Sequence, residues 1–126
     1  MRLPSRRRLL LALPAIAYAA LILFLSSRPG SQIPSIGIAY GDKVLHAAEY
    51  FLYGLLLLYP TRDLGWRGRV LSLAVGLAYA AFDEAFQTGV PGRAGDVFDW
   101  AADAVGLAVA VALDGLVRAR IAAKTA

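Results

Sequence analysis

Residues 82–106, FDEAFQTGVPGRAGDVFDWAADAVG, lie between two long apolar runs and decide how the rest of the chain is organised. This stretch carries acidic, basic and amide side chains at short intervals: Asp83, Glu84, Gln87, Arg93, Asp96, Asp99 and Asp103. Most of the other strongly apolar sequence has no acid. The fold must therefore explain why so many carboxyl groups lie beside, and partly inside, sequence typical of a membrane span.

The composition favours a single membrane-embedded domain, 1–126. Of the 126 residues, 59% are hydrophobic, a share too high for an ordinary soluble domain of this size. The formal net charge of +4 could indicate a nucleic-acid partner. The basic residues, however, flank apolar runs instead of alternating with aromatic side chains, so we expect no nucleic acid among the partners.

Two residue counts limit the chemistry. The chain has no cysteine, which excludes disulfides, thiolate metal sites and a cysteine nucleophile. Its single histidine, His46, can supply only one imidazole to a catalytic or metal site. Oxygen ligands with one imidazole would suit magnesium, calcium, manganese or zinc, but no strong metal-ligand spacing is present. The sequence therefore predicts no metal site, and a divalent cation is the less favoured alternative.

Four apolar runs predict an all-α integral membrane bundle of four transmembrane helices. Their expected bounds are about 9–25, 44–59, 70–86 and 97–117. The first run could also be a secretory signal peptide with a cleavage site at residues 17–19, AYA. An uncleaved helix is favoured because the run continues to about Leu25, which is long enough to span a bilayer.

The charges predict which side of the membrane each end of the bundle faces. In a hairpin topology, the side with both chain ends carries ten basic residues and two acids. The other side carries three basic residues and seven acids. By the positive-inside rule, the N- and C-termini are cytoplasmic and the acidic side is extracytoplasmic.

Polar residues of three helices are expected at one depth near the outer boundary, because a helix rises about 1.5 Å per residue. A charged group facing lipid costs about 2.5–3.5 kcal/mol at the helix centre, so these groups must face one another, water or a ligand. Asp96, Asp99, Asp103, Gly106 and Ala110 share one helix face by their spacing. The candidate ligand-binding residues, here called the polar layer, are Asp42, Lys43, His46, Glu49, Asp83, Glu84, Gln87, Arg93, Asp96, Asp99 and Asp103.

Several of these residues also have purely structural interpretations. Asp96 could be the N-cap of the last helix with Asp99 as its capping-box partner, and Asp42 could cap the second helix. His46 could bond a carboxylate across the bundle. Arg93 could neutralise the acids instead of binding a phosphate or carboxylate. On this interpretation the polar layer only holds the helices together.

Three segments are similar to the VanZ-like family of small bacterial membrane proteins. They are DKVLHAAEYFLYGLL (42–56), DEAFQ (83–87) and PGRAGDVFDWAADAVG (91–106). The residues that carry the family pattern are Asp42, Lys43, His46, Glu84, Gln87, Arg93, Asp99 and Gly106. The family usually has Asn where this chain has Asp103. The resemblance implies a multi-pass protein of the bacterial plasma membrane and cell envelope. It also implies a link to low-level resistance to teicoplanin, a glycopeptide antibiotic that binds peptidoglycan precursors outside the membrane.

Two functions are weighed from these observations. The first is binding of a lipid-linked or glycopeptide-like ligand, because glycopeptides carry amines that a negatively charged site attracts. The alternative is a membrane enzyme that acts on a lipid headgroup or cell-wall precursor at the outer leaflet. Its catalytic candidates are Glu84 or Asp99 as general base and His46 as acid–base partner, with Arg93 as phosphate clamp. Ion transport is less favoured, because the inner halves of the helices have few polar residues.

Overall fold

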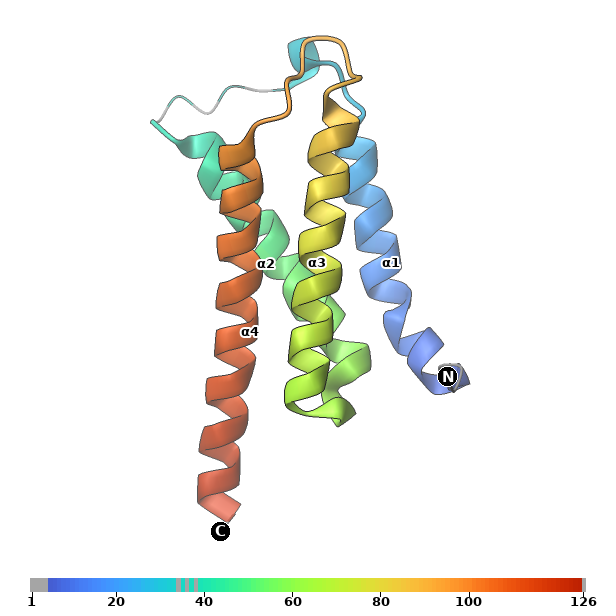
Figure 1. Ribbon diagram of the computed structural model, residues 1–126, viewed down its shortest axis with the longest axis vertical. Coiled ribbons are helices and arrows are strands. Elements are labelled where there is room, and N and C mark those ends of the chain that lie inside the picture. Colours follow the sequence, from blue (N-terminus) through green and yellow to red (C-terminus); the bar gives the residue numbers. More distant parts are fainter. Residues whose placement is uncertain (1–4, 34, 36, 38, 126) are drawn as a thin grey trace.

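The computed structural model describes residues 5–33, 35, 37 and 39–125. Figure 1 shows four α-helices that run alternately up and down: α1 (Arg6–Ser26), α2 (Gly41–Thr61), α3 (Trp66–Gln87) and α4 (Val97–Thr125). Two short 3₁₀ helices, η1 (Gly30–Gln32) and η2 (Arg62–Leu64), lie in the connections. The described residues contain no strand, so the predicted all-α fold is confirmed.

The helix bounds lie within a few residues of the predicted ones, except at the end of α4. That helix was expected to end at about 117, but it continues to Thr125. The extra segment consists mostly of Ala, Arg, Ile and Lys, which tolerate or favour helix, and it contains no glycine or proline that would stop it. The end of α4 therefore extends beyond the neighbouring helices (Figure 1).

Small residues let α2, α3 and α4 approach one another closely. A Cβ atom at Gly106 of α4 would overlap the backbone carbonyl oxygen of Ala47 on α2. Gly54 of α2 and Gly76 of α3 both face Leu107 of α4, which is fully buried. These three glycines therefore serve as packing contacts between the helices. The α2–α4 pair forms the most extensive contact between helices, as small residues at a membrane helix interface allow.

The end of the bundle where α2 and α4 begin and α3 ends has polar groups inside and apolar groups outside. The buried polar side chains there include Asp83, Glu84, Gln87 and Asp103. Large apolar side chains are exposed on the same helix segments, namely Val44, Leu45, Phe82, Phe86, Val97 and Phe98. A soluble domain buries its apolar side chains and keeps most charges in water. This reversed distribution is the one expected when lipid surrounds the helices.

Two of the described helices are long and apolar enough to cross a bilayer by length and composition. They are α1, with a mean hydropathy of 2.4, and α4, with a mean hydropathy of 1.7. The polar layer interrupts the apolar sequence of α2 at its start and that of α3 at its end. The start of α1 and the end of α4 lie at the end of the bundle opposite the polar layer (Figure 1).

Candidate functional site

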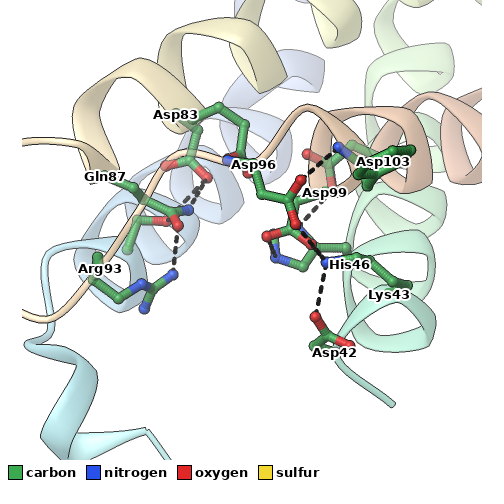
Figure 2. A network of polar contacts seen from close by, with 12 residues as sticks. Asp42, Lys43, His46, Asp83, Gln87, Arg93, Asp96, Asp99 and Asp103 are labelled. Atoms are coloured by element: carbon green, nitrogen blue, oxygen red, sulfur yellow. Dashed lines mark hydrogen bonds and ion pairs between the residues drawn. The ribbon is translucent and has the colours of Figure 1, made fainter. Parts of the chain in front are cut away.

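Lys43, in the first turn of α2, is the cation that connects α2 to α4. Its Nζ donates to Oδ2 of Asp42 at 2.8 Å, to Oδ2 of Asp96 at 2.9 Å and to Oδ1 of Asp99 (Figure 2). The hydrogen bond from Lys43 lowers the pKa of both Asp42 and Asp96. In turn the carboxylates, Asp42 foremost, raise the pKa of Lys43. Lys43 therefore stays protonated at neutral pH and holds the starts of α2 and α4 together.

His46 lies one turn deeper and sits between two carboxylates of α4. Its Nδ1 is 2.9 Å from Oδ1 of Asp103, and its Nε2 is 3.6 Å from Oδ2 of Asp99. Glu84 of α3 completes the group, because one ligand atom each of His46, Glu84 and Asp99 lies within 4.8 Å of the others. The predicted bond from His46 to a carboxylate across the bundle is confirmed. We call His46, Glu84, Asp99 and Asp103 the central cluster.

Glu84 also links the central cluster to the start of α4. Its Oε2 accepts the backbone N–H of Asp96 at 3.0 Å. Asp96 caps α4 with its own side chain, since its Oδ1 accepts the N–H of Phe98 at 2.8 Å. The predicted N-cap at Asp96 is confirmed. The predicted capping-box partner is wrong, because a carboxylate of α3 takes that role and Asp99 turns towards Lys43.

The interpretation of Asp42 as a helix cap is also wrong. Helix α2 begins at Gly41, and its N-cap position is Tyr40, whose φ of 59° lies in the left-handed region. Asp42 stands in the first helical turn, where a carboxylate interacts favourably with the positive end of the helix dipole. Its role is to hold Lys43 and not to cap the helix.

A second group of polar side chains joins α1 to α3. Ser26 Oγ donates to Oδ2 of Asp83 at 2.9 Å, and Nε2 of Gln87 lies 3.2 Å from each of these two oxygens. Arg93, in the turn after α3, donates to Oε1 of Gln87 at 2.7 Å (Figure 2). Among the described residues, Arg93 contacts the amide of Gln87 and forms no ion pair. Ser26 was missed by the sequence reasoning, although a hydroxyl at the polar end of an apolar helix is a usable signal.

Several buried polar atoms of the bundle have no hydrogen-bond partner among the described residues. They are the hydroxyl of Tyr50, Oδ1 of Asp83, Oε1 of Glu84 and Oδ2 of Asp103. Leaving a buried donor or acceptor unpaired costs about 1–3 kcal/mol, and more for a charged group. The polar layer therefore calls for further partners, which can be protons, water or a cation.

A shallow pocket of about 340 Å³ opens on the side of the bundle, between the end of α3 and the start of α4. The residues that line it are Ala81, Glu84, Ala85, Thr88, Gly95, Asp96, Val97 and Trp100. Glu84 is only 8% exposed, yet it belongs both to this pocket and to the central cluster. The pocket therefore lies directly beside the polar layer.

The opposite end of the bundle holds ion pairs that involve arginine. Arg8 donates to Asp63 at 2.6 Å and lowers the pKa of that carboxyl, and Arg118 pairs with Asp114 at 2.8 Å. Asp114 and Arg118 are four residues apart on α4, a spacing that places both side chains on one face of the helix. Such exposed pairs contribute only about 0–1 kcal/mol each, so they fix helix ends more than they stabilise the fold.

The bundle as a whole corresponds to a known family. A family model described as VanZ/LLP1 matches residues 11–118. The chain belongs to the VanZ/LLP1 family. The comparison with curated proteins found no match, and neither did the comparison with solved structures. Family membership and the two long apolar helices together indicate a membrane protein.

The arrangement of this VanZ/LLP1 protein explains one departure from the VanZ-like pattern. Asp103 stands where the pattern usually has Asn, and here its Oδ1 receives the hydrogen bond of His46. An ionised carboxylate makes a shorter and stronger bond to an imidazole N–H than a neutral amide does. The acid at this position therefore orients the imidazole ring.

Most of the predicted polar layer is brought together, but in two groups. Lys43, Asp42 and Asp96 extend the central cluster towards the end of the bundle. Asp83, Gln87 and Arg93 form the second group with α1. Glu49 is half-buried on α2 and makes no hydrogen bond or ion pair with another described residue. The neighbouring residues 83 and 84 face different helices and so connect the two groups.

Proposed function

We propose that this VanZ/LLP1 protein is a multi-pass protein of the bacterial plasma membrane, with four spans and cytoplasmic termini. The exposed apolar side chains around the polar layer support the embedding of all four helices. The basic residues at the opposite end support the orientation, because positive charge is retained on the cytoplasmic side. In this orientation the polar layer faces the outside of the cell.

The polar layer binds a lipid-linked or glycopeptide-like ligand, and this binding provides the link to teicoplanin resistance. The observation that carries this function is the shared position of Glu84, in the lateral pocket and in the central cluster. A ligand that lies in the membrane beside α3 and α4 reaches this carboxyl without crossing the bundle. The acids of the layer outnumber its basic residues, which favours ligands that carry amines.

Filling the pocket tests the proposed function. Ala85→Trp places a large side chain in the pocket and removes no charge, while Ala112→Trp, exposed on the far half of α4, is the matched control. The probes are teicoplanin and a lipid-linked peptidoglycan precursor, and bound molecules are counted by native mass spectrometry in mild detergent. We expect Ala85→Trp to weaken binding of a probe at least tenfold and Ala112→Trp to leave it unchanged. Equal binding by the wild type and both variants would exclude this pocket.

The enzymatic alternative is supported by one contact. The hydrogen bond between His46 and Asp103 orients the imidazole and directs its Nε2 towards Asp99, which places an acid–base partner beside a carboxylate that can serve as general base. In this alternative Glu84 or Asp99 takes a proton from the nucleophile, and the substrate is a lipid headgroup or wall precursor. Turnover of a lipid-linked precursor that persists in a Glu84→Ala, Asp99→Ala double variant would rule out these roles.

A further inference from the structure

We infer that His46, Glu84 and Asp99 form a binding site for one divalent transition-metal cation, with Zn²⁺ preferred over Mn²⁺. The three side chains come from three different helices, and one ligand atom from each lies within 4.8 Å of the others. This inference deepens the proposed function and rests on it only in using the same polar layer. The spacing along the sequence could not indicate such a site, because each helix supplies a single ligand.

The distance between two of the ligand atoms fits a metal better than a hydrogen bond. Nε2 of His46 and Oδ2 of Asp99 are 3.6 Å apart. A charge-assisted hydrogen bond between such atoms would be about 2.7–2.9 Å long. Two ligands that bind a tetrahedral zinc at about 2.0–2.1 Å are about 3.4 Å from each other. The observed gap is therefore close to that of two neighbouring ligands around one cation.

Each of the three side chains has its other polar atom already occupied. Nδ1 of His46 lies 2.9 Å from Oδ1 of Asp103, and an Nδ1–H donated to this carboxylate gives the tautomer whose neutral imidazole has its lone pair on Nε2. Lys43 donates a hydrogen bond to Oδ1 of Asp99, so Oδ2 is the oxygen that can bind a metal. The backbone N–H of Asp96, at the start of α4, donates to Oε2 of Glu84, so Oε1 is the oxygen that can bind a metal. These contacts are the outer partners that orient ligands in a metal site.

The unpaired oxygen of Glu84 is a second and independent indication. The residue is more than nine-tenths buried, and Oε1 has no hydrogen-bond partner among the described residues. A proton would satisfy only one acceptor. A divalent cation would satisfy Glu84, Asp99 and the imidazole together, and would balance the two carboxylate charges. The lateral pocket beside Glu84 supplies the entry path that a metal site needs.

The ligand set selects among cations. One imidazole and two carboxylates suit zinc or manganese, whereas calcium takes about 6–8 oxygen ligands, more than this cluster offers. Zinc with three protein ligands keeps a fourth position for water or for an anionic group. A phosphate of a lipid-linked ligand is a group of that chemistry.

The test counts metal in the full-length protein. The wild type is purified in mild detergent, loaded with Zn²⁺ or Mn²⁺, passed through gel filtration and measured by elemental mass spectrometry. We expect about one Zn²⁺ per chain, weaker retention of Mn²⁺, and a melting temperature that rises with Zn²⁺ and falls again with a chelator. Glu84→Gln and Asp99→Asn keep the side-chain shape, and we expect each to raise the Kd for Zn²⁺ at least tenfold.

The matched control is Asp83→Asn, which alters a buried carboxyl of the second polar group one residue away. We expect its affinity for Zn²⁺ to equal that of the wild type. The inference is overturned if the wild type retains no Zn²⁺ or Mn²⁺ and shows no thermal shift, if only Ca²⁺ binds, or if Asp83→Asn loses the metal as Glu84→Gln does. A wild type that binds teicoplanin or lipid-linked precursor but retains no metal after loading would overturn this inference and leave the proposed function intact. A stoichiometric metal in a protein that binds neither probe would support this inference and contradict the proposed function.

Discussion

Lys43 holds the exposed edge of the polar layer together by charge. Its hydrogen bond lowers the pKa of Asp96 below the ordinary value of 3.8. A carboxyl whose pKa is lower in the folded than in the unfolded protein stabilises the fold fully above its unfolded pKa. That contribution is lost as the pH falls through the lower, folded-state pKa. The ion pair therefore supports the fold at neutral pH and not in strong acid.

Replacing this lysine should therefore change the pH dependence of stability. We expect Lys43→Met to melt at a lower temperature than the wild type at a pH of about 6, with the difference shrinking as the pH falls below 3.8 through the lowered pKa of Asp96. The pKa of Asp96, followed by the NMR shift of its carboxyl carbon, should rise in the variant. Lys124→Met, at the far end of α4, is the control for lost charge alone. An unchanged Asp96 titration in Lys43→Met would show that the backbone N–H of Phe98 is sufficient to set that pKa.

The sequence identified which residues belong to the polar layer, but it did not predict which of them bond to each other. Three-residue and four-residue spacing was enough to place Asp99 and Asp103 on one face of α4. It could not show that Asp103 pairs with His46, or that Glu84 accepts the N–H of Asp96. Those contacts depend on the rotation of each helix about its axis, which packing against the other helices determines.

The crossing of α2 and α4 is the element that determines those rotations. Gly106 brings α4 against the backbone of α2, and a Cβ atom there would overlap the carbonyl oxygen of Ala47. Backbone cannot move aside as a flexible side chain can. We therefore expect Gly106→Ala to destabilise the bundle by about 1–3 kcal/mol, the usual cost of overpacking. Thermal unfolding in detergent measures the difference.

A second glycine of the same helix provides the control. A Cβ at Gly115 would come no closer than 3.7 Å to a side-chain nitrogen of Arg69, which is an ordinary contact. Gly115→Ala should therefore be neutral or stabilise the helix, by at most about 1 kcal/mol. If both variants melt alike, close approach at Gly106 is not what holds α2 and α4 in register.

The helices themselves were predictable, and their ends were less so. Apolar runs located all four elements, because burial in lipid requires about 20 apolar residues in a row. The end of α4 was predicted too early, since the apolar run ends at about residue 117 but the helix continues through the basic residues that follow it. The cap supplied by Glu84 could not be predicted, because it comes from another helix.

For the molecule as a whole, the separation of charge predicts its orientation. The chain has no cysteine, so single cysteines can report which side each end faces. We expect Ala94→Cys, in the exposed turn before α4, to react with a membrane-impermeant maleimide in intact cells. Ala122→Cys, exposed near the end of α4, should react only after the cells are made permeable. Labelling of residue 122 in intact cells would contradict the proposed orientation and show that the end of α4 faces the outside of the cell.

The sequence also predicted that polar groups of three helices meet at one end of the bundle, because helical rise alone sets their depth. It did not predict that the layer divides into two groups, since the spacing along α3 separates Asp83 from Glu84 but does not say which helix each one contacts. Their side chains point about 100° apart around α3, one towards α1 and the other towards α4.

The partners of α3 have a consequence for how the protein is made. Asp83 depends on a hydroxyl of α1, which the ribosome has already produced, but Glu84 depends on an N–H of α4, which follows it. Until that segment emerges, the acid at residue 84 lacks this partner, and a charged group in the membrane costs up to about 2.5–3.5 kcal/mol at the centre and less near the boundary. We therefore expect α3 and α4 to leave the translocon together as one hairpin. In the proposed orientation, the turn at 88–95 then crosses the membrane during synthesis before α3 is released into lipid.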